Sequence, residues 1–144
     1  MAYTDEKVEN QQPGYLSEDR LKGAKVLLAE DNTVNRELEK DYLGDAGCLV
    51  DCAENGEVAV AMVHEKGIDY YDLILMDVRM PVMDGNEAIR RIRAMGADKL
   101  PIIAVSAYTL EEDRKETIEA GATAFISKPI VISNVLLAMG SIRR

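Results

Sequence analysis

Leu73-Ile74-Leu75-Met76-Asp77 is the stretch that decides the fold, because an unbroken apolar run ends there on a carboxylate. A strand that is apolar on both faces is typical of the centre of a parallel sheet that helices cover on both sides. The runs at residues 26–29 and 102–105 are apolar throughout in the same way. These three runs predict the central strands of one sheet.

Further strands and five helices are predicted around this centre. A strand at residues 49–53 carries Asp51 and is expected at an edge, and another is expected at residues 124–126. Cap residues and apolar spacing predict five helices. Three are expected at residues 33–46, 56–66 and 132–142. A fourth is expected to start after Asp84, and a fifth after Thr109, with Glu112 as the reciprocal cap. The alternation of strand and helix predicts an α/β domain with a doubly wound, five-stranded parallel sheet.

Length and charge limit the class of protein. The chain has 144 residues and a net charge of −9, which suits one domain and disfavours direct nucleic-acid binding. No apolar run approaches the roughly 20 residues of a membrane span, and the N-terminus lacks a secretory signal, so we expect a cytoplasmic protein. Residues 1–22 are polar and are expected to form a flexible leader or linker, with the domain at residues 23–144. Cys48 and Cys52 are expected to be free thiols.

Polar residues stand where four of the predicted strands end: Glu30-Asp31, Asp77, Ser106 and Lys128. The carboxyl ends of parallel strands meet at one edge, so these side chains are expected to face a single crevice. Three carboxylates repel one another, and a hard divalent cation such as Mg²⁺ removes that cost. An ammonium group and a hydroxyl group suit a phosphoryl group. The set predicts a phosphoryl-transfer site with an aspartate nucleophile.

Four motifs in these positions resemble the response-regulator receiver family. They are Val26-Leu27-Leu28-Ala29-Glu30-Asp31-Asn32, Leu75-Met76-Asp77-Val78-Arg79-Met80-Pro81-Val82-Met83-Asp84-Gly85, Ala104-Val105-Ser106-Ala107 and Ser127-Lys128-Pro129. The resemblance covers residues 21–142 and implies a flavodoxin-like strand order, 2-1-3-4-5, with five helices. It also implies a phosphorelay domain of two-component signalling that accepts a phosphoryl group from phosphohistidine.

The resemblance implies a role for each acidic residue of the crevice. Asp77 is the expected phospho-acceptor. Mg²⁺, or Mn²⁺ in its place, is expected to bind Glu30, Asp31, Asp77 and the backbone carbonyl of Arg79. The backbone N–H groups of Arg79 and Ala107 are expected to contact the phosphoryl group. The Arg79 side chain is expected to modulate how fast that group is lost.

The remaining implied roles concern contact and switching. Ser106 and Lys128 are expected to contact the phosphoryl group, and Ser106 and Phe125 to act as the switch pair. Tyr108 is expected either to modulate phosphoryl loss or to be a plain surface tyrosine. The bond between Lys128 and Pro129 is expected to be cis. Serine at position 106, where threonine is commoner in the family, keeps the hydroxyl but lacks the methyl that restricts its rotamer.

A subgroup and its partners are also implied. Residues 30–36 and 80–85 look most like receivers of hybrid sensor histidine kinases, and Leu21-Lys22-Gly23 resembles the linker that follows a kinase ATP-binding domain. The implied partners are a histidine kinase or a histidine phosphotransfer protein, with no contact to nucleic acid or membrane. The chain is not expected to be an enzyme beyond losing its own phosphoryl group. A second copy or another partner is expected to dock on the face of the fourth helix, the fifth strand and the fifth helix, where Leu137 points outward.

Three other functions fit parts of the sequence. A Mg²⁺-dependent phosphatase or phosphotransferase of the haloacid-dehalogenase type also uses an aspartate nucleophile. That class places an Asp-x-Asp pair after the first strand, whereas here the first strand ends in Glu30-Asp31-Asn32 and the expected nucleophile follows the third strand. A flavodoxin-type carrier has related topology, but the acidic pair Glu30-Asp31 would repel a flavin phosphate. A pure interaction module with an inactive site is the third. Turnover of small phosphate esters and a coloured protein would reveal the first two.

Overall fold

The computed structural model describes residues 18–107 and 110–140. In chain order the elements are η2 (Glu18–Leu21), β1 (Lys25–Ala29), α2 (Thr33–Asp45), β2 (Leu49–Ala53), α3 (Gly56–Lys66), β3 (Leu73–Asp77), α4 (Gly85–Ala94), β4 (Ile102–Ser106), α5 (Glu111–Ala120), β5 (Ala124–Ser127) and α6 (Ile132–Gly140). All neighbouring strands pair in parallel, in the order β2-β1-β3-β4-β5. The predicted fold class and strand order are confirmed.

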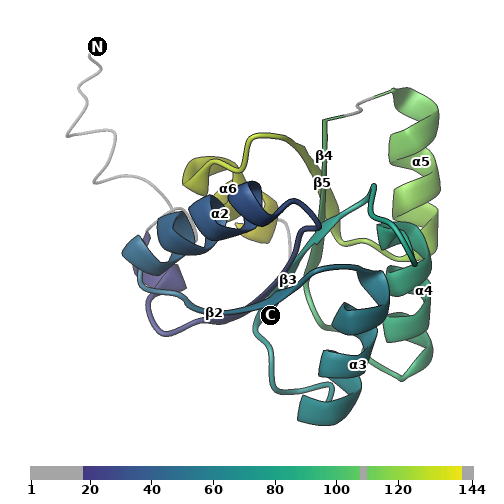
Figure 1. The fold of residues 1–144 in the computed structure, drawn as a ribbon, viewed down its shortest axis with the longest axis horizontal. Coiled ribbons are helices and arrows are strands. Elements are labelled where there is room, and N and C mark those ends of the chain that lie inside the picture. Colours follow the sequence, from purple (N-terminus) through teal and green to yellow (C-terminus); the bar gives the residue numbers. More distant parts are fainter. Residues whose placement is uncertain (1–17, 108–109, 141–144) are drawn as a thin grey trace.

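Helices cover the sheet on both faces (Figure 1): α2 and α6 lie on one face and α3, α4 and α5 on the other. Successive residues of a strand point to opposite faces, so the central strands feed two separate cores. In β3, Ile74 packs in the core beneath α3, α4 and α5, whereas Leu75 packs in the core beneath α2 and α6. Every residue of β3 and β4 is buried, as the two-faced apolar runs predicted. Among the described residues, no helix is both long and apolar enough to cross a bilayer.

The turns that follow β1, β2 and β3 end in side-chain caps. Asn32, Asn55 and Asp84 precede α2, α3 and α4, and each accepts a hydrogen bond of 2.9 Å from the backbone N–H three residues later. Each cap satisfies one of the free amides at a helix start and fixes where the chain turns. These caps place the start of α2 directly after the acidic end of β1, and the start of α4 after the loop that follows Asp77.

The prediction of a Thr109–Glu112 cap for α5 is wrong. The helix begins at Glu111 after Leu110, whose side chain makes no capping hydrogen bond, and Thr109 itself lies outside the described residues. Leucine has no acceptor to offer, and the three acidic residues of the first turn instead compensate the positive helix end. Only Thr117 and Ala120 of α5 are buried, so this helix packs on the domain through few side chains.

Part of the segment that the sequence predicted as a leader packs against the domain. Glu18–Leu21 forms a short 3₁₀ helix, and the Leu21 side chain is fully buried in the core beneath α2 and α6. Gly23 also donates a backbone hydrogen bond of 2.8 Å to Gly47, next to the edge strand β2. The part of the expected leader at residues 1–17 lies outside the described residues.

Truncating Leu21 tests whether this short helix belongs to the folded unit. We expect Leu21→Ala to lower the free energy of unfolding by roughly 2–4 kcal/mol, because it removes buried methyl groups and leaves a cavity. Leu38→Ala is the matched control, since Leu38 is 63% exposed on α2 and its truncation should cost less than about 0.5 kcal/mol. Urea unfolding of both variants measures the difference, and equal small losses would place Leu21 outside the core.

Candidate functional site

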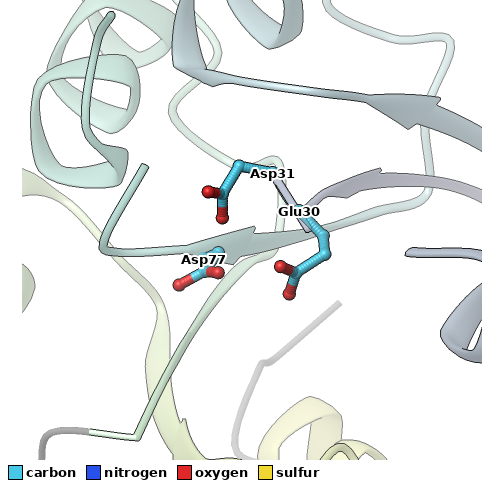
Figure 2. A group of neighbouring side chains, drawn as sticks. All are labelled: Glu30, Asp31 and Asp77. Carbon is cyan, nitrogen blue, oxygen red and sulfur yellow. The ribbon is translucent and has the colours of Figure 1, made fainter. Parts of the chain in front are cut away.

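Three carboxylates meet at the carboxyl ends of β1 and β3 (Figure 2). Glu30 and Asp31 directly follow β1, and Asp77 is the last residue of β3. One oxygen of each carboxylate lies within 4.8 Å of the others, the spacing of groups that bind a common metal ion. Glu30 and Asp77 are buried, whereas Asp31 is exposed. Hard oxygen ligands of this kind, with an open side, fit Mg²⁺.

Lys128, which follows the strand β5, links two of the three carboxylates. Its Nζ donates a hydrogen bond of 2.9 Å to Glu30 Oε1 and one of 2.8 Å to Asp77 Oδ2. The Lys128–Pro129 peptide bond that follows is cis, as expected. The Lys128 backbone N–H donates to the Ser106 carbonyl at 2.9 Å, which anchors the lysine to the end of β4. Residues at the ends of β1, β3 and β5 therefore form one ionic network, which a backbone hydrogen bond anchors to β4.

The carboxylates and the lysine shift one another's ionisation. Burial raises the pKa of Asp77, the charge of Glu30 adds to this, and the Lys128 ammonium opposes both, so that the pKa lies at about 6. Burial alone would lower the pKa of Lys128, but its hydrogen bonds to Asp77 and Glu30 outweigh burial and raise it. The lysine is therefore a fixed cation at neutral pH. Two carboxylates of like charge that are buried side by side raise the free energy of the folded chain, and a bound divalent cation would remove that cost.

Backbone groups hold the carboxylates in position. The Asn32 N–H donates to Glu30 Oε2 at 3.0 Å, and the Arg79 N–H donates to Asp77 Oδ1 at 3.2 Å. A Cβ at Gly85 would collide with the backbone carbonyl of Asp77. Only glycine allows α4 to start this close to the end of β3, and the intervening loop therefore stays beside the acidic cluster.

Ser106 and Phe125 come from the two strands beyond β3. Ser106 is the buried last residue of β4, and Phe125 is buried in β5 beneath α5. Both line a cavity of about 250 Å³ that also reaches Arg79 and the start of α4. The Arg114 guanidinium lies 4.8 Å from the centre of the Phe125 ring, so this ring is in contact with α5.

Comparison with known proteins gives the family. The model of the response regulator receiver domain matches residues 26–139. This chain belongs to the response regulator receiver domain family. It is 52% identical over 108 residues to a two-component response regulator of rice, ORR41, with 74% of this chain and 84% of the relative covered. It is 42% identical over 112 residues to hybrid signal transduction histidine kinase I of Dictyostelium discoideum. That match covers 74% of this chain and 6% of the kinase.

Solved structures give the same result. The receiver domain of the histidine kinase CKI1 from Arabidopsis thaliana, complexed with Mg²⁺ and BeF₃⁻, is 33% identical with a TM-score of 0.77 and covers 86% of this chain and 94% of its own. The receiver domain of sensor histidine kinase PA1611 from Pseudomonas aeruginosa, with magnesium in its active site cleft, is 35% identical with a TM-score of 0.73 and covers 83% of this chain and 97% of its own. The chain is thus a receiver domain of two-component systems, not a member of the dehalogenase or flavodoxin classes.

The receiver fold brings most of the predicted site residues together. Glu30, Asp31, Asp77 and Lys128 form one cluster, and Ser106 lies at the neighbouring strand end. Arg79 follows in the loop after β3, and its guanidinium lies 3.6 Å from Asp113 of α5. Tyr108 lies outside the described residues. Cys48 and Cys52 are free thiols, as the sequence indicated, and His64 is an exposed residue of α3.

Several residues around the site escaped the sequence analysis. Arg36 of α2 donates through Nη1 to the carbonyl of Glu30 at 2.8 Å and so braces the turn after β1. Glu39, one helical turn further, has its pKa raised to about 7 by burial and by Glu30. Asn86 and Thr117 are buried polar residues of α4 and α5. The signal that could have found Glu39 and Asn86 is their spacing from apolar residues of the same helix. Glu39 is four residues before the buried Leu43 and Asn86 is three before Ile89, so each lies on the buried face of its helix.

The raised pKa of Asp77 makes a prediction about stability in the absence of metal. The unfolded chain binds fewer protons at Asp77 than the folded one between pH 4 and 6, so ionisation of Asp77 lowers stability as the pH rises through about 6. Asp77→Asn should therefore raise the free energy of unfolding at pH 7.5 by roughly 1–3 kcal/mol, and the gain should vanish near pH 4. Urea unfolding in EDTA at pH 7.5 and at pH 4 measures this difference in the free energy of unfolding. Asp69→Asn, at an exposed aspartate, should gain nothing, and a wild-type-like Asp77→Asn would contradict the electrostatic assignment.

Proposed function

We propose that Asp77 accepts a phosphoryl group from a phosphohistidine of a histidine kinase or a histidine phosphotransfer protein. The hydrogen bond of 2.8 Å from Lys128 Nζ to Asp77 Oδ2, inside the acidic cluster, carries this proposal. A lysine that already contacts one oxygen of the acceptor is placed to contact a phosphoryl group on that acceptor. The cluster also fits Mg²⁺, with Glu30, Asp31, Asp77 and the Arg79 backbone carbonyl as the proposed ligands.

The transfer follows from the positions of these groups. A carboxylate oxygen of Asp77 attacks the phosphorus, the bond from phosphorus to the imidazole nitrogen breaks, and its electron pair stays on the imidazole. Lys128 and the Ser106 hydroxyl stabilise the charge on the phosphoryl oxygens, with the backbone N–H groups of Arg79 and Ala107 as further donors. When bound, Mg²⁺ would supply charge neutralisation between the carboxylates and the phosphoryl oxygens.

The relatives support this reading. The CKI1 receiver was solved with Mg²⁺ and BeF₃⁻, and the PA1611 receiver with magnesium in its active site cleft. Receiver domains work with histidine kinases or phosphotransfer proteins, and the hybrid kinases of Dictyostelium contain a segment similar to this chain. We propose that the chain is cytoplasmic, binds no nucleic acid or membrane, and catalyses nothing beyond loss of its own phosphoryl group, at a rate that Arg79 and Tyr108 modulate.

We further propose that phosphorylation is signalled through α5, β5 and α6. The helix α5 packs through few buried side chains, which is typical of parts of a protein that move. Charge added at Asp77 would draw in the Ser106 hydroxyl and leave room for Phe125 to turn toward it. The result is a shift between two packings of this face, not refolding. Leu137 is 54% exposed on α6, which makes the face a candidate for a partner or for a second copy.

Phosphorylation of variants tests the acceptor. Asp77→Asn keeps the shape of the side chain but loses the attacking oxygen, so labelling from radioactive acetyl phosphate or from a phosphohistidine donor should fall to background. Asp69→Asn, an exposed aspartate away from the site, should label like the wild type. If Asp77→Asn were labelled as strongly as the wild type, the acceptor would have to be another residue.

Metal removal tests the acidic cluster. Labelling should need Mg²⁺ or Mn²⁺ and stop in excess EDTA, because an incoming phosphoryl group otherwise meets three carboxylates. Asp31→Ala should weaken Mg²⁺ binding in a titration followed by NMR shifts of residues 30–32 and 77–79. Full labelling in EDTA would contradict the proposed metal.

Beryllofluoride with Mg²⁺ tests the signalling face, because it mimics an aspartyl phosphate. Backbone NMR shifts or hydrogen exchange should change beside Asp77 and also across residues 110–140. The matched control is Asp77→Asn with the same additions, which should show no change across residues 110–140. Changes confined to residues that touch the mimic would refute the switch while leaving the acceptor assignment intact.

A further inference from the structure

The cavity beside Ser106 is lined by two buried polar side chains, each with an atom that no other described residue satisfies. The cavity lies between the loop after β3, the start of α4, the middle of α5, the end of β4 and Phe125 in β5, and its volume is about 250 Å³. Asn86 is 8% exposed and Thr117 is fully buried, and both line the cavity. Asn86 Oδ1 and Thr117 Oγ1 have no hydrogen-bond partner among the described residues. We call this cavity the Asn86–Thr117 pocket.

Unpartnered buried polar atoms indicate what the pocket accepts. A buried acceptor without a hydrogen bond costs free energy that an apolar side chain at the same place would not. Asn86 Oδ1 can only accept a hydrogen bond, and the Thr117 hydroxyl can accept one as well as donate one. A group that donates several hydrogen bonds at once can therefore satisfy both atoms. The volume is several times the roughly 30 Å³ that one water molecule takes in the liquid, so a side-chain end fits.

The rim of the pocket adds a charge requirement. Asp84, Asp113 and Glu116 line it, and Arg79 is the one cationic side chain among its described lining residues. The pairings of these acids are long: Arg79 Nη2 lies 3.6 Å from Asp113, and the Arg90 guanidinium lies 3.9 Å from Glu116. Such exposed pairs are weak, and the pocket keeps an excess of negative charge.

We propose that the Asn86–Thr117 pocket binds an arginine side chain of a protein partner. The guanidinium carries five donors in a plane and keeps its charge at any physiological pH, which matches buried acceptors beneath an acidic rim. A divalent cation fits less well, because the only described acidic group with metal-ligand spacing is the Glu30, Asp31 and Asp77 cluster. The exposed apolar residues Leu110 and Ile118 on α5 offer the body of a protein partner further contact.

The pocket shares Ser106 and Arg79 with the neighbouring phosphoryl site. The pocket is already formed in the structure described here, so binding of the arginine does not require phosphorylation. Its coupling to phosphorylation rests on the proposed function, because movement of Ser106 or Phe125 would change the shape of the pocket. The test therefore uses the unphosphorylated chain, so that its failure and the failure of the acceptor assignment are separate results.

A tripeptide pair tests the pocket by NMR titration of the isotope-labelled full chain. Acetyl-Gly-Arg-Gly-amide should shift the Asn86 side-chain amide and the backbone amides of Thr117 and Ser106 saturably. The same peptide with citrulline, which has the same shape but no charge, should bind at least about tenfold more weakly. Equal binding of both peptides would overturn the proposal. Methylguanidinium binding as tightly as the arginine peptide would also overturn it, by showing a site for small cations.

Variants locate the binding. Asn86→Leu with Thr117→Val removes both buried acceptors and should abolish saturable shifts, with circular dichroism confirming the fold. If that variant does not fold, Asp113→Asn with Glu116→Gln keeps the core unchanged and should weaken binding at least about tenfold. Glu119→Gln, an exposed acid of α5 outside the pocket, is the control and should bind like the wild type. Equal weakening by Glu119→Gln would show attraction to general surface charge and refute the pocket.

Discussion

The two hydrogen bonds of Lys128 hold the site of this receiver domain together. Each joins an ammonium to a carboxylate that is more than nine-tenths buried, so neither carboxylate can exchange its partner for bulk water. A buried carboxylate left without its cation would be strongly destabilising. The positions of β1, β3 and the turn after β5 are therefore coupled, because moving any one of them leaves a charge unpaired.

Much of the fold was predictable from local sequence, and the reasons are specific. The strand Leu73–Asp77 is apolar on both faces, which indicated a covered central strand. Asn32, Asn55 and Asp84 cap helices as expected, because an acceptor beside its own helix start needs no distant partner. The acidic cluster was also predictable, since strand ends of a parallel sheet meet at one edge.

What escaped prediction depends on contacts far apart in the chain. Leu21 is one apolar residue in a polar stretch, and only the finished core gives it a place. Arg93 looks like a surface residue of α4, yet its guanidinium donates to the carbonyls of Ala97, Leu100 and Gly121. The apolar periodicity of a helix does not distinguish such an arginine from one that is exposed to solvent. The unpartnered atoms of Asn86 and Thr117 likewise become visible only when α4 and α5 lie together.

The separation of Lys128 from its partners has a consequence for biosynthesis. Lys128 follows Glu30 by 98 residues and Asp77 by 51. At ribosomal rates of about 5–20 residues per second, roughly 3–10 seconds pass between synthesis of Asp77 and of the lysine that completes its site. During that interval β4 and β5 are also incomplete, and a nascent chain presents only the acidic residues. Under the proposed function, a donor protein would meet a competent acceptor only after translation has passed the last strand.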